Sequence, residues 1–555
     1  MKYLVTSALP YANGPIHLGH LAGAYLPADI YVRYLKNQER EVIYICGTDE
    51  HGVPITISAE ANNTNPDKLV KSHHDIISQA FAETGMSFDI FSGTHNKLHA
   101  ELSQEFFKQL YANGYVSEDE LEQFYCEKCN RFLPDRYVEG ICPHCKQEAR
   151  GDQCDSCGNS LSSTELIEPF CKLCGEKPAL KKSKHLFLEL KKFQPQLEEW
   201  LASKKDWKPN VKAFCEQWLK RGLEKRCITR DLDWGVPVPL AGYENKVLYV
   251  WFDAPIGYVS FTKELLENKP ELYKWEAWWQ GGEEVKLVHF IGKDNIVFHS
   301  IIWPAMLMGQ TEKYKLPDCI PANEFLNLEG QKISTSKNWA IWVHDFVKVF
   351  NPDALRYYLG LIAPEARDSD FSYKGFQTAN NSELVGLYGN FINRNLAFLN
   401  KYYEGKLIEG EYVFTSQEDE LWSEVKKECE IIKECYENFK VREAIFHFME
   451  ISRLANKYFD TQEPWQLRKK DEKRCQAVLL TCLNLINTLA IISEPIIPFS
   501  ARRVKKMLNL AEDFRFSQLE VSAIKPGHII GQVEILFTRL EDDIIEEEKS
   551  KLGRS

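Results

Sequence analysis

The sequence lacks the two features that would place the chain in or across a membrane. No stretch approaches the roughly 18 to 20 consecutive apolar residues of a spanning helix. The N-terminus has no basic segment followed by an apolar core and a small-residue cleavage site, and begins instead in the strand-like run Tyr3-Leu4-Val5-Thr6. These absences predict a cytoplasmic protein with no membrane segment. They also predict that the 16 cysteines are reduced thiols or metal ligands rather than disulfides.

Excess positive charge is missing as well. The 68 Lys and Arg residues face 80 Asp and Glu residues, for a formal net charge of -12. This balance excludes wholesale electrostatic coating of nucleic acid, so any contact with nucleic acid must be local. The composition, 44% hydrophobic and 27% charged, excludes long disorder and low-complexity architecture. A chain of 555 residues is expected to hold about three or four domains.

Glycine is absent between Gly410 and Gly527. Prolines punctuate this region at positions typical of helix starts and boundaries. Apolar residues recur there at helical spacing, at Val441, Ile445, Phe448, Ile451, Ala455 and Tyr458. The region is therefore predicted to be an all-helical domain.

Two other regions alternate short β-rich runs with longer helical segments. The first covers residues 1 to about 115, and the second contains the runs 247–252 and 287–291, both predicted as buried strands. This rhythm predicts βαβ units on a parallel sheet. From Cys126 to Cys174, cysteine, glycine and charged residues replace hydrophobic periodicity. We therefore expect one sheet domain that is split by an insertion with another source of order.

Eight cysteines form four Cys-x-x-Cys pairs, at Cys126/Cys129, Cys142/Cys145, Cys154/Cys157 and Cys171/Cys174. Two residues between thiolates let both reach one tetrahedral zinc, so eight ligands predict two zinc sites with four cysteines each. The spacing leaves consecutive, interleaved and nested pairings open. A thioredoxin-type redox pair is an alternative for one such motif, but not for four in so short a stretch. With four protein ligands each, both sites are expected to be structural.

A histidine pair follows the first predicted strand. His17 and His20 would lie one turn apart near the start of a helix. Backbone N–H groups there favour anions, and two imidazoles can donate hydrogen bonds to phosphate oxygens. Gly19 between them would let a planar base approach the backbone. The spacing alone is equally compatible with surface histidines or a chance metal pair.

A second polar segment, Gly330-Gln331-Lys332-Ile333-Ser334-Thr335-Ser336-Lys337, is a glycine-led loop with two lysines. Such a loop is suited to contacting a polyphosphate. On its own, a loop of this composition is usually solvated surface. We refer to residues 330–337 as the signature loop.

Together, His17-Leu18-Gly19-His20 and Lys332-Ile333-Ser334-Thr335-Ser336 resemble, in order and separation, the two signatures of class I aminoacyl-tRNA synthetases. Longer segments narrow the resemblance to methionyl-tRNA synthetases over essentially the whole chain. These segments are Ala8 to Asn13, Gly47-Thr48-Asp49-Glu50-His51-Gly52, Trp251-Phe252-Asp253-Ala254-Pro255-Ile256-Gly257-Tyr258, and Phe290-Ile291-Gly292-Lys293-Asp294 with His299 and Trp303-Pro304-Ala305.

The resemblance implies an α/β fold in which a Rossmann-like parallel-sheet catalytic domain is split by a zinc-knuckle insertion and followed by an all-α helical bundle that binds the anticodon. The boundaries expected are 1–115 and 233–325 for the catalytic halves, 116–232 for the insertion, 326–386 for the signature-loop domain, 387–530 for the bundle and 531–555 for a C-terminal extension. The resemblance also implies nested zinc sites, an inner one on Cys142, Cys145, Cys154 and Cys157 and an outer one on Cys126, Cys129, Cys171 and Cys174.

The implied activity is that of a methionine-tRNA ligase, which forms methionyl-adenylate from methionine and ATP with Mg²⁺ and then charges tRNA(Met) for initiation and elongation. A carboxylate is already a nucleophile, so the protein must align the reactants and stabilise phosphate charge. By resemblance, the catalytic residues are His17, His20, Lys332, Ser334 and Ser336, with Lys332 at the leaving pyrophosphate. Contacts to ATP are further expected from Asn13, Gly19, Thr335 and Lys337.

A methionine site needs a carboxylate for the ammonium and polarisable walls for the thioether. By resemblance Asp49 takes the ammonium, and a helical segment after Asp294 would place three of the wall residues on one face. The walls implied are Leu9, Tyr11, Trp251, Ala254, Pro255, Tyr258, Ile296, His299 and Trp303. In the helical domain, Asn390, Arg394 and Trp465 match the positions that the family uses for the anticodon, where a base can stack on indole.

One departure concerns the signature loop, because the family's usual Lys-Met-Ser-Lys-Ser has Ile333 and Thr335 here, leaving Lys337 as the next cation. Synthetases for isoleucine, valine and leucine are disfavoured, since zinc knuckles occupy the insertion in place of a large editing domain. The alternative from another class is a zinc-knuckle RNA-binding protein on an inactive synthetase scaffold. The residues that argue against it are Asp49, His17, His20 and Lys332. A monomer is expected. Some relatives dimerise through a C-terminal tRNA-binding domain, and none is recognisable in this sequence.

Overall fold

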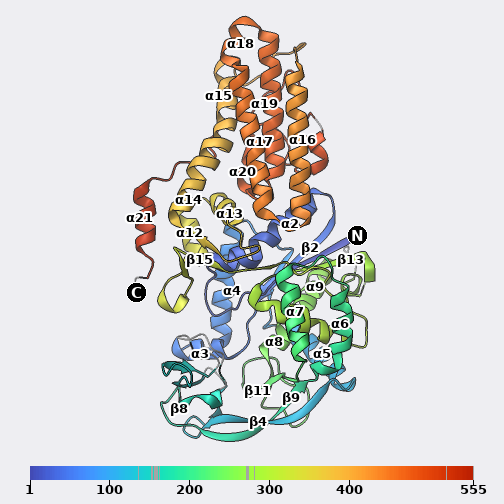
Figure 1. Cartoon of the computed structure of the whole chain (residues 1–555), viewed down its shortest axis with the longest axis vertical. Helices are drawn as coiled ribbons and strands as arrows, with labels where there is room; N and C mark the ends of the chain where they lie inside the picture. Colours follow the sequence, from blue (N-terminus) through green and yellow to red (C-terminus); the bar gives the residue numbers. More distant parts are fainter. Residues whose placement is uncertain are drawn as a thin grey trace.

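A five-stranded parallel sheet forms the centre of the computed structural model, which describes residues 1–134, 137–151, 154, 161, 163–269, 274–280, 282–520 and 522–553 (Figure 1). The strand order is β14-β13-β1-β2-β3, and every neighbouring pair is parallel. The strands are β1 (Lys2–Ser7), β2 (Glu41–Thr48), β3 (Ile90–Gly93), β13 (Val285–Gly292) and β14 (Ala322–Asn323). β2 and β3 lie on one side of β1, and β13 and β14 lie on the other, so the strand order reverses direction at β1. Such a reversal is called a switch point, and ligands bind open parallel sheets there, beside the carboxyl ends of the strands.

Side chains alternate between two apolar layers along the sheet. Val5, Tyr44 and Val288 belong to the core on one face, which also contains α2 (Leu26–Asn37). Leu4 and Leu287 belong to the core on the other face. That second core contains residues of α5 (Lys97–Ala112), α9 (Gly257–Glu267) and α11 (Trp303–Met308). Helices therefore cover both faces, which confirms the predicted Rossmann-like arrangement.

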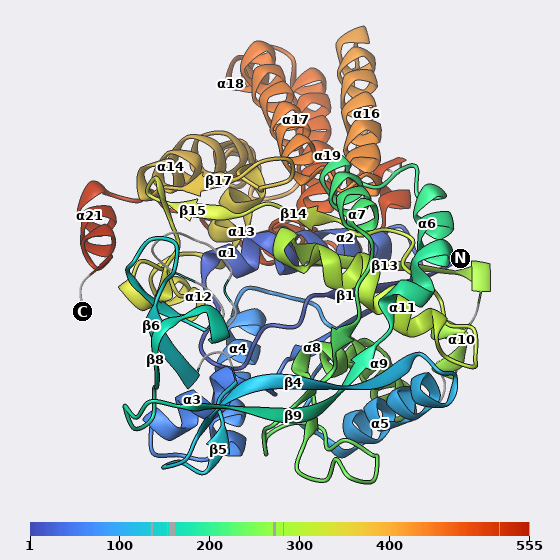
Figure 2. The same cartoon turned by 60° about the horizontal axis from the view of Figure 1, so that its bottom comes forward.

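A long antiparallel ribbon leads into the insertion and out of it. β4 (Val116–Cys126) pairs with β9 (Ala179–Leu188), and Figure 2 shows the two strands crossing the front of the molecule. β5 and β10 extend this sheet at its two edges, and β7-β6-β8 form a separate small sheet. The remaining strands are β5 (Arg131–Phe132), β6 (Val138–Ile141), β7 (Glu148–Arg150), β8 (Ile167–Cys171) and β10 (Arg226–Cys227). The core of this insertion is small and contains four buried cysteines, as expected for a segment that needs metal to be ordered.

Residues 247–252 correct one prediction made from the sequence. Only Val247 and Leu248 form a strand, β12, and the chain then turns into the short helix α8 (Val250–Asp253). The Tyr249 N–H still bonds to the Ile228 carbonyl at 2.9 Å, and Phe252 N–H already bonds back to the Tyr249 carbonyl at 2.7 Å. A short apolar run is compatible with a buried strand or a buried helix, so periodicity did not separate them.

An unbroken helical rod connects the signature-loop region to the bundle. It consists of α14 (Tyr373–Ala379), the π-helical segment η10 (Asn380–Gly389) and α15 (Asn390–Tyr403). The signature loop begins at the turn of a hairpin of β15 (Leu326–Leu328) and β16 (Gln331–Lys332), so β16 is its first part, and β17 (Ser369–Phe371) pairs with β15 on the other side. The helices α12 (Val343–Val349) and α13 (Pro352–Leu361) complete this region.

The helical bundle occupies the upper end of the molecule in Figure 1. All six residues predicted from helical spacing lie buried on α17, which confirms the all-α domain. α19 is the one helix of the described residues long and apolar enough to cross a membrane, and 94% of its most apolar window is buried inside the protein. Its composition is thus that of a core helix. The bundle helices are α16 (Ser416–Glu437), α17 (Val441–Gln462), α18 (Pro464–Lys470), α19 (Glu472–Ser493) and α20 (Pro498–Met507).

Buried charges join the bundle to the sheet domain. Asp29 Oδ2 on α2 accepts hydrogen bonds from Arg356 Nη2 at 2.7 Å and Arg33 Nε at 2.8 Å. Arg33 Nη1 also donates to Glu494 Oε1 at 2.5 Å, just beyond α19. Burial alone would raise the pKa of Asp29, but the charges of Arg33 and Arg356 outweigh it and lower that pKa to about 2. We call these four side chains the interdomain ionic network.

Beyond α20 the chain returns towards the sheet domain. It ends in α21 (Asp542–Ser550), which lies beside α14 and β15 in both Figure 1 and Figure 2. The far end of the chain is thus placed next to the region that carries the signature loop.

Candidate active site

The two sequence signatures meet at the switch point of the sheet. The segment after β1 runs antiparallel to the segment after the signature loop, since His17 and Trp342 form an isolated bridge. Leu18 N–H donates to the Ile341 carbonyl at 3.0 Å, and Val343 N–H donates to the Ile16 carbonyl at 3.0 Å. Segments more than 300 positions apart in the chain are therefore held together by backbone hydrogen bonds.

His17 and His20 cap each other at the start of α1 (Leu18–His20). His17 Nδ1 accepts from the backbone N–H groups of Gly19 at 3.1 Å and His20 at 3.3 Å, and His20 Nδ1 accepts from His17 N–H at 3.2 Å. The rings stack with centroids 3.7 Å apart. Because each Nδ1 is an acceptor, each ring carries its proton on Nε2. The fold thus presents two N–H donors side by side.

Both imidazoles are neutral. Burial lowers the pKa of His17 well below its usual value, and the neighbouring His20 lowers it further. The surrounding protein also lowers the pKa of His20 to about 4, although this residue is exposed to solvent. The pair can therefore donate hydrogen bonds at neutral pH without changing charge.

Gly19 is required by close packing. A Cβ at this position would lie 2.9 Å from His17 Cε1 and 3.0 Å from Ile333 Cδ1 of the signature loop. Any side chain would press the histidine ring and the loop apart. The glycine thus lets the two signatures approach each other.

The signature loop is exposed at its cations and fixed at its base. Lys332 and Lys337 lie on the surface, whereas Ser334 and Trp339 exchange two backbone hydrogen bonds of 2.9 Å each. Lys332 lies close enough to Asp368 to lower the pKa of that carboxyl, after the larger effect of a hydrogen bond from Lys293. Thr335 begins a single 3-10 turn, Thr335–Lys337. The side chain of Ser336 lies outside the described residues.

Asp49 is the buried carboxylate among the predicted methionine-binding residues. It is 6% exposed, and its Oδ1 has no hydrogen-bond partner among the described residues. Burial, together with the neighbouring Asp253 carboxylate, raises the pKa of Asp49 well above its usual value. An uncompensated buried carboxylate of this kind needs a cation. Tyr11 pairs with Asp49 in a backbone bridge and donates its hydroxyl to the His51 carbonyl at 2.5 Å.

Tyr258 and His299 form one polar wall of the same site. Their Oη and Nε2 atoms are 2.8 Å apart. His299 Nδ1 lies 3.0 Å from the Asn295 carbonyl, so this nitrogen carries the proton and Tyr258 donates to Nε2. Burial lowers the pKa of His299 to about 4. The wall is therefore uncharged, as a thioether site requires.

The remaining predicted methionine residues divide into two groups. Ile296 and Trp303 are buried on the helical segment after β13, with His299 between them, and Pro255 is buried beside half-buried Ala254. Leu9 reaches Gly257, where a Cβ would lie 3.0 Å from its Cδ1. Trp251 is placed differently: it is 44% exposed and its ring packs on Phe298, with centroids 4.5 Å apart.

A buried histidine-carboxylate cluster behind Asp49 was not predicted. His51 Nδ1 lies 2.6 Å and His99 Nε2 lies 3.6 Å from Asp253 Oδ2. The first distance is that of a direct hydrogen bond, since two ligands of one zinc would stand about 3.3 Å apart. Burial opposes ionisation, but His51 and His99 outweigh it and lower the pKa of Asp253. His51 and Asp253 stand inside two of the family-like segments, and that was the only available signal.

His289 is a second residue that the sequence reasoning missed. It lies on β13, and its Nδ1 is 2.5 Å from Thr6 Oγ1 on β1. Its ring packs against Tyr258, with centroids 5.0 Å apart. The position of a histidine in a predicted buried strand does not indicate this contact, because its neighbour Tyr258 lies on α9.

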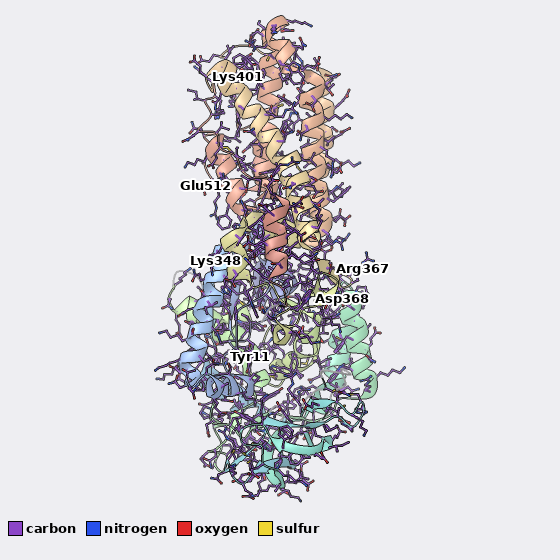
Figure 3. All side chains as sticks on the ribbon, turned by 90° about the vertical axis from the view of Figure 1, so that its left-hand side faces the viewer. Tyr11, Lys348, Arg367, Asp368, Lys401 and Glu512 are labelled. Atoms are coloured by element: carbon purple, nitrogen blue, oxygen red, sulfur yellow. The ribbon has the colours of Figure 1, made fainter. Side chains whose placement is uncertain are left out.

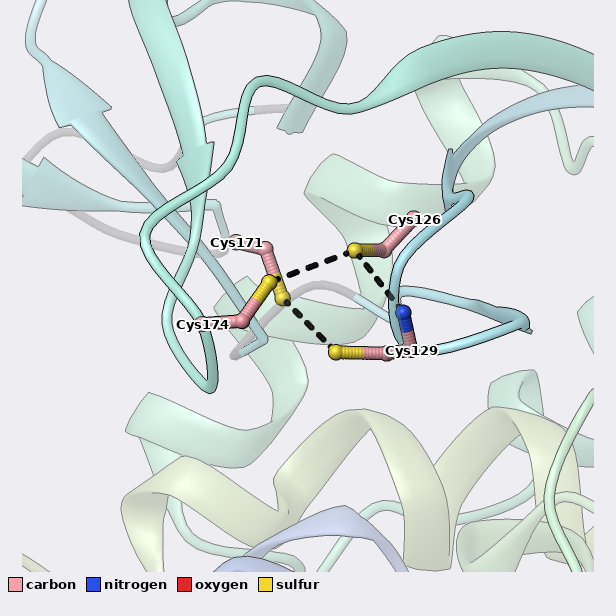
Figure 4. A group of neighbouring side chains, drawn as sticks. All are labelled: Cys126, Cys129, Cys171 and Cys174. Atoms are coloured by element: carbon pink, nitrogen blue, oxygen red, sulfur yellow. Dashed lines mark hydrogen bonds between the residues drawn. The ribbon is translucent and has the colours of Figure 1, made fainter.

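Four of the cysteines gather as one group (Figure 4). Cys126 Sγ lies 3.4 Å from Cys174 Sγ, and Cys129 Sγ lies 3.9 Å from Cys171 Sγ. All four sulfurs are within 4.8 Å of one another. Tetrahedral Zn–S bonds of about 2.3 Å would place sulfurs about 3.8 Å apart. A soft tetrahedral ion therefore fits these four thiolates.

A second cysteine group is formed by cysteines that lie between Cys129 and Cys171 in the sequence. Cys142, Cys145 and Cys154 bring their sulfurs within 4.8 Å of one another, and Cys145 Sγ is 3.5 Å from Cys154 Sγ. Cys157 lies outside the described residues. The grouping of the seven described cysteines is nested, with the second group enclosed in the sequence between the halves of the first.

The predicted anticodon residues lie far from Asp49, on the bundle. Asn390 and Arg394 stand one turn apart on α15, and Trp465 follows on α18. Arg394 lies over the Phe459 ring at 4.9 Å, and the Phe459 and Trp465 rings are 6.0 Å apart. Trp465 is 38% exposed. Figure 3 places Lys401, which is also on α15, near the upper end of the molecule and Tyr11 below its middle.

Comparison with known proteins agrees with this geometry. The profile of the family described as "tRNA synthetases class I (M)" matches residues 3–396, and that of "Anticodon binding domain of methionyl tRNA ligase" matches residues 409–554. A methionine--tRNA ligase of Bacteroides fragilis is 49% identical over 99% of this chain and 80% of its own length. The corresponding ligase of Cytophaga hutchinsonii is 48% identical over 99% of this chain, with 81% of its own length covered.

Among solved structures, the fold is similar to a Mycobacterium tuberculosis methionyl-tRNA synthetase in complex with methionyl-adenylate. The TM-score is 0.80 at 24% identity, over 97% of this chain and 100% of that one. Two family profiles that cover both halves of the molecule, together with relatives of almost 50% identity, leave one assignment. The chain belongs to the methionyl-tRNA synthetases, a family of class I aminoacyl-tRNA synthetases.

Proposed function

We propose that the chain activates L-methionine with ATP and transfers it to the 3'-terminal ribose of tRNA(Met), for both initiation and elongation. The observation that supports this most is the meeting of three parts at one switch point. Two neutral N–H donors at His17 and His20 and the cations of the signature loop lie at the same edge of the sheet as Asp49, whose Oδ1 has no hydrogen-bond partner in the described part of the chain. These are the groups that an amino acid and a polyphosphate require together.

In the proposed first step, a methionine carboxylate oxygen attacks the α-phosphorus of ATP. The bond from this phosphorus to the oxygen that bridges to the β-phosphate breaks, and pyrophosphate leaves with that electron pair. His17 and His20 donate from Nε2 to the α- and β-phosphate oxygens. Lys332 neutralises the departing pyrophosphate, and Mg²⁺ that arrives with ATP shares its charge.

The other nucleotide contacts are proposed from the same two segments. Gly19 leaves the adenine or ribose free to approach the backbone of α1, and Asn13 lies in the exposed turn before it. The loop residues contribute hydroxyls and the second cation, from Ser334, Thr335, Ser336 and Lys337.

Asp49 binds the methionine ammonium in this proposal. Its high pKa without a ligand means that a bound cation would restore the ionised form, so binding and ionisation are linked. The thioether lies against the neutral Tyr258–His299 wall. The apolar remainder is supplied by Leu9, Tyr11, Trp251, Ala254, Pro255, Ile296 and Trp303.

The tRNA is proposed to bridge the two ends of the molecule. Its terminal ribose hydroxyl would attack the adenylate carbonyl at the sheet. The bond from this carbonyl carbon to the phosphate oxygen breaks, AMP leaves with that electron pair, and the hydroxyl proton is released as the ester forms. The anticodon would stack on Trp465 and meet Asn390 and Arg394 on the bundle. Arg394 is held for this by Asp460, at 2.7 Å. Stacking of one base is worth about 1 to 3 kcal/mol, so Trp465→Ala should weaken aminoacylation and leave adenylate formation nearly unchanged.

Zinc is the metal proposed for both cysteine groups. All-thiolate, four-coordinate sites favour zinc and leave no position for a substrate, so both sites would hold the insertion together. The seven described cysteines and Cys157 would supply eight ligands. Thiolates stay available to a metal in the cytoplasm, which is the compartment proposed. Elemental analysis of purified protein should give about two zinc ions per chain.

The decisive experiment is ATP–pyrophosphate exchange with each of the twenty amino acids. Methionine alone should support exchange, and Asp49→Ala should nearly abolish it, because an ammonium without its buried partner costs about 3 to 5 kcal/mol. Asp345→Ala, which removes an exposed carboxylate on α12, is the matched control and should retain activity. Absence of methionine-dependent exchange in the zinc-loaded wild type would favour an RNA-binding protein on an inactive scaffold.

A further inference from the structure

The C-terminal segment is anchored on the helical rod before it reaches the signature loop. Asn380 Nδ2 donates to the Thr538 carbonyl at 2.9 Å. Gln377 Nε2 donates to the Leu540 carbonyl at 3.0 Å and to Asp542 Oδ1 at 2.9 Å. The first turn of α21 is therefore fixed to the rod by side-chain amides rather than by apolar packing alone.

The last residues of this segment contact the signature loop on both sides. Lys549 Nζ lies 2.9 Å from Glu329 Oε2, immediately before the loop. Gly553 N–H donates to the Asn338 carbonyl at 3.0 Å, immediately after the loop. Figures 1 and 2 agree that α21 is the element that flanks this region on the outside. The residues that flank the loop on either side are thus held by α21 and by the three residues that follow it.

Each contact on the loop side is itself well fixed. Glu329 is only 15% exposed, and its other oxygen accepts from Tyr373 N–H at 2.8 Å, at the start of the rod. Gly553 lies against Trp339, since a Cβ there would be 3.4 Å from the indole ring, and Trp339 Nε1 donates to the Leu328 carbonyl at 3.0 Å. Hairpin, rod and α21 meet at these points.

Apolar contacts keep α21 in place. Ile545 is 2% exposed, and Leu552 packs against the core of the sheet domain. Lys551 on the same helical segment behaves differently from Lys549. It pairs with Glu547 at 3.4 Å and with Glu548, both on its own helix. The chain therefore offers two lysines with the same charge and similar exposure, of which one contacts the loop segment and the other does not.

We propose that α21 braces the signature loop and that Lys549 is a positioning residue for adenylate formation. The inference rests on the proposed role of the loop at the pyrophosphate. The cations of the loop are exposed and must be ordered when the phosphate charge develops, and ordering a flexible segment costs conformational entropy. Fixing both ends of a short loop lowers this cost in advance, so the brace should act on kcat rather than on methionine binding.

The test compares Lys549→Met with Lys551→Met as the matched control. Single-turnover adenylate formation should slow about two- to fivefold in Lys549→Met, the range expected for one exposed ion pair, with an unchanged KM for methionine. Amide hydrogen exchange of residues 329–339 should become faster in the same variant. Lys549→Arg should restore both readouts, and Lys551→Met should leave both unchanged.

A second variant tests the other end of the brace. Gly553 has a φ of +70°, which proline cannot adopt, and proline has no N–H to donate. Gly553→Pro should therefore also speed amide exchange at residues 329–339. The proposal is overturned if Lys549→Met has the same rate of adenylate formation and the same amide-exchange profile as Lys551→Met. It is also overturned if only one of these two readouts changes in Lys549→Met. If the wild type lacks methionine-dependent ATP–pyrophosphate exchange, the proposed function fails. Amide hydrogen exchange at residues 329–339 still tests in that case whether α21 orders the loop.

Discussion

Two regions of the molecule depend on charged side chains and treat them in opposite ways. In the interdomain ionic network the side chains of Asp29 and Arg356 are fully buried, and Arg33 is 8% exposed. In the signature loop Lys332 and Lys337 are exposed, and only the base of the loop is fixed. Buried charges hold one geometry because losing a partner is costly, whereas exposed charges can be reoriented at little cost. The interdomain ionic network therefore fixes the position of the bundle on the sheet domain. The lysines of the signature loop can instead move as charge develops on the phosphates.

The largest effect should come from breaking the buried network. Asp29→Ala leaves two buried guanidinium groups without their shared acceptor, and such a change costs about 3 to 5 kcal/mol of stability. Urea unfolding monitored by circular dichroism measures it. Asp345→Ala breaks an exposed pair with Lys348 and should cost at most about 1 kcal/mol. Equal losses in the two variants would remove the distinction between the regions.

The exposed loop should show the reverse pattern. Lys332→Ala should slow single-turnover adenylate formation by about 10²- to 10³-fold, the loss typical of one strong transition-state donor. Its free energy of unfolding should stay within about 0.5 kcal/mol of the wild type, since the side chain is exposed. A large loss of stability in this variant would show that Lys332 supports the fold rather than the reaction.

Acid should weaken the buried network but not the exposed signature loop, which has no carboxylate of its own. The pKa of Asp29 is about 2 in the folded protein, below the value of about 3.9 in an unfolded chain. The stabilisation is thus present above about pH 4 and is lost as the pH falls towards about 2, by about 2 to 3 kcal/mol in total. Urea unfolding between about pH 5 and about pH 3 should show this slope in the wild type. The slope should be shallower in Asp29→Asn, which does not titrate.

The smallest effect concerns the second cation of the loop. Thr335 stands at the second basic position of the Lys-Met-Ser-Lys-Ser signature that the sequence resembles, and Lys337 is our candidate replacement. Lys337→Ala should slow adenylate formation by less than about tenfold, because an exposed mobile charge contributes less than a positioned donor. Thr335→Lys should partly restore the rate of Lys337→Ala. Wild-type behaviour of Lys337→Ala would mean that the loop works with one lysine.

The sequence predicted those parts of the fold that depend on local patterns. Apolar spacing identified α17, and the alternation of strands and helices identified the split parallel sheet. The run 247–252 was predicted wrongly, since a short apolar stretch has no period that separates strand from helix. The nesting of the cysteine groups depended on resemblance, because two-residue spacing is the same in every pairing.

The candidate site was predictable as a set of motifs but not as a set of contacts. The two signatures could be read from the chain, and the backbone bridge between His17 and Trp342 could not. The carboxylate of Asp253 was overlooked because its partners, His51 and His99, come from other segments of the chain. Buried polar networks are satisfied by tertiary neighbours, and no local spacing records them.

The helical rod of α14, η10 and α15 has a mechanical consequence. Its backbone is continuous from Tyr373, which bonds to Glu329 beside the signature loop, to Tyr403 near the outer end of the bundle. At about 1.5 Å per residue the rod is roughly 45 Å long, and a tilt of about 3° at one end moves the other by about 2 Å. Arg394 lies on α15, in the outer part of this rod. A change in the angle of the rod that is too small to disturb the packing of the bundle would thus shift the residues at its opposite end by more than the length of a covalent bond.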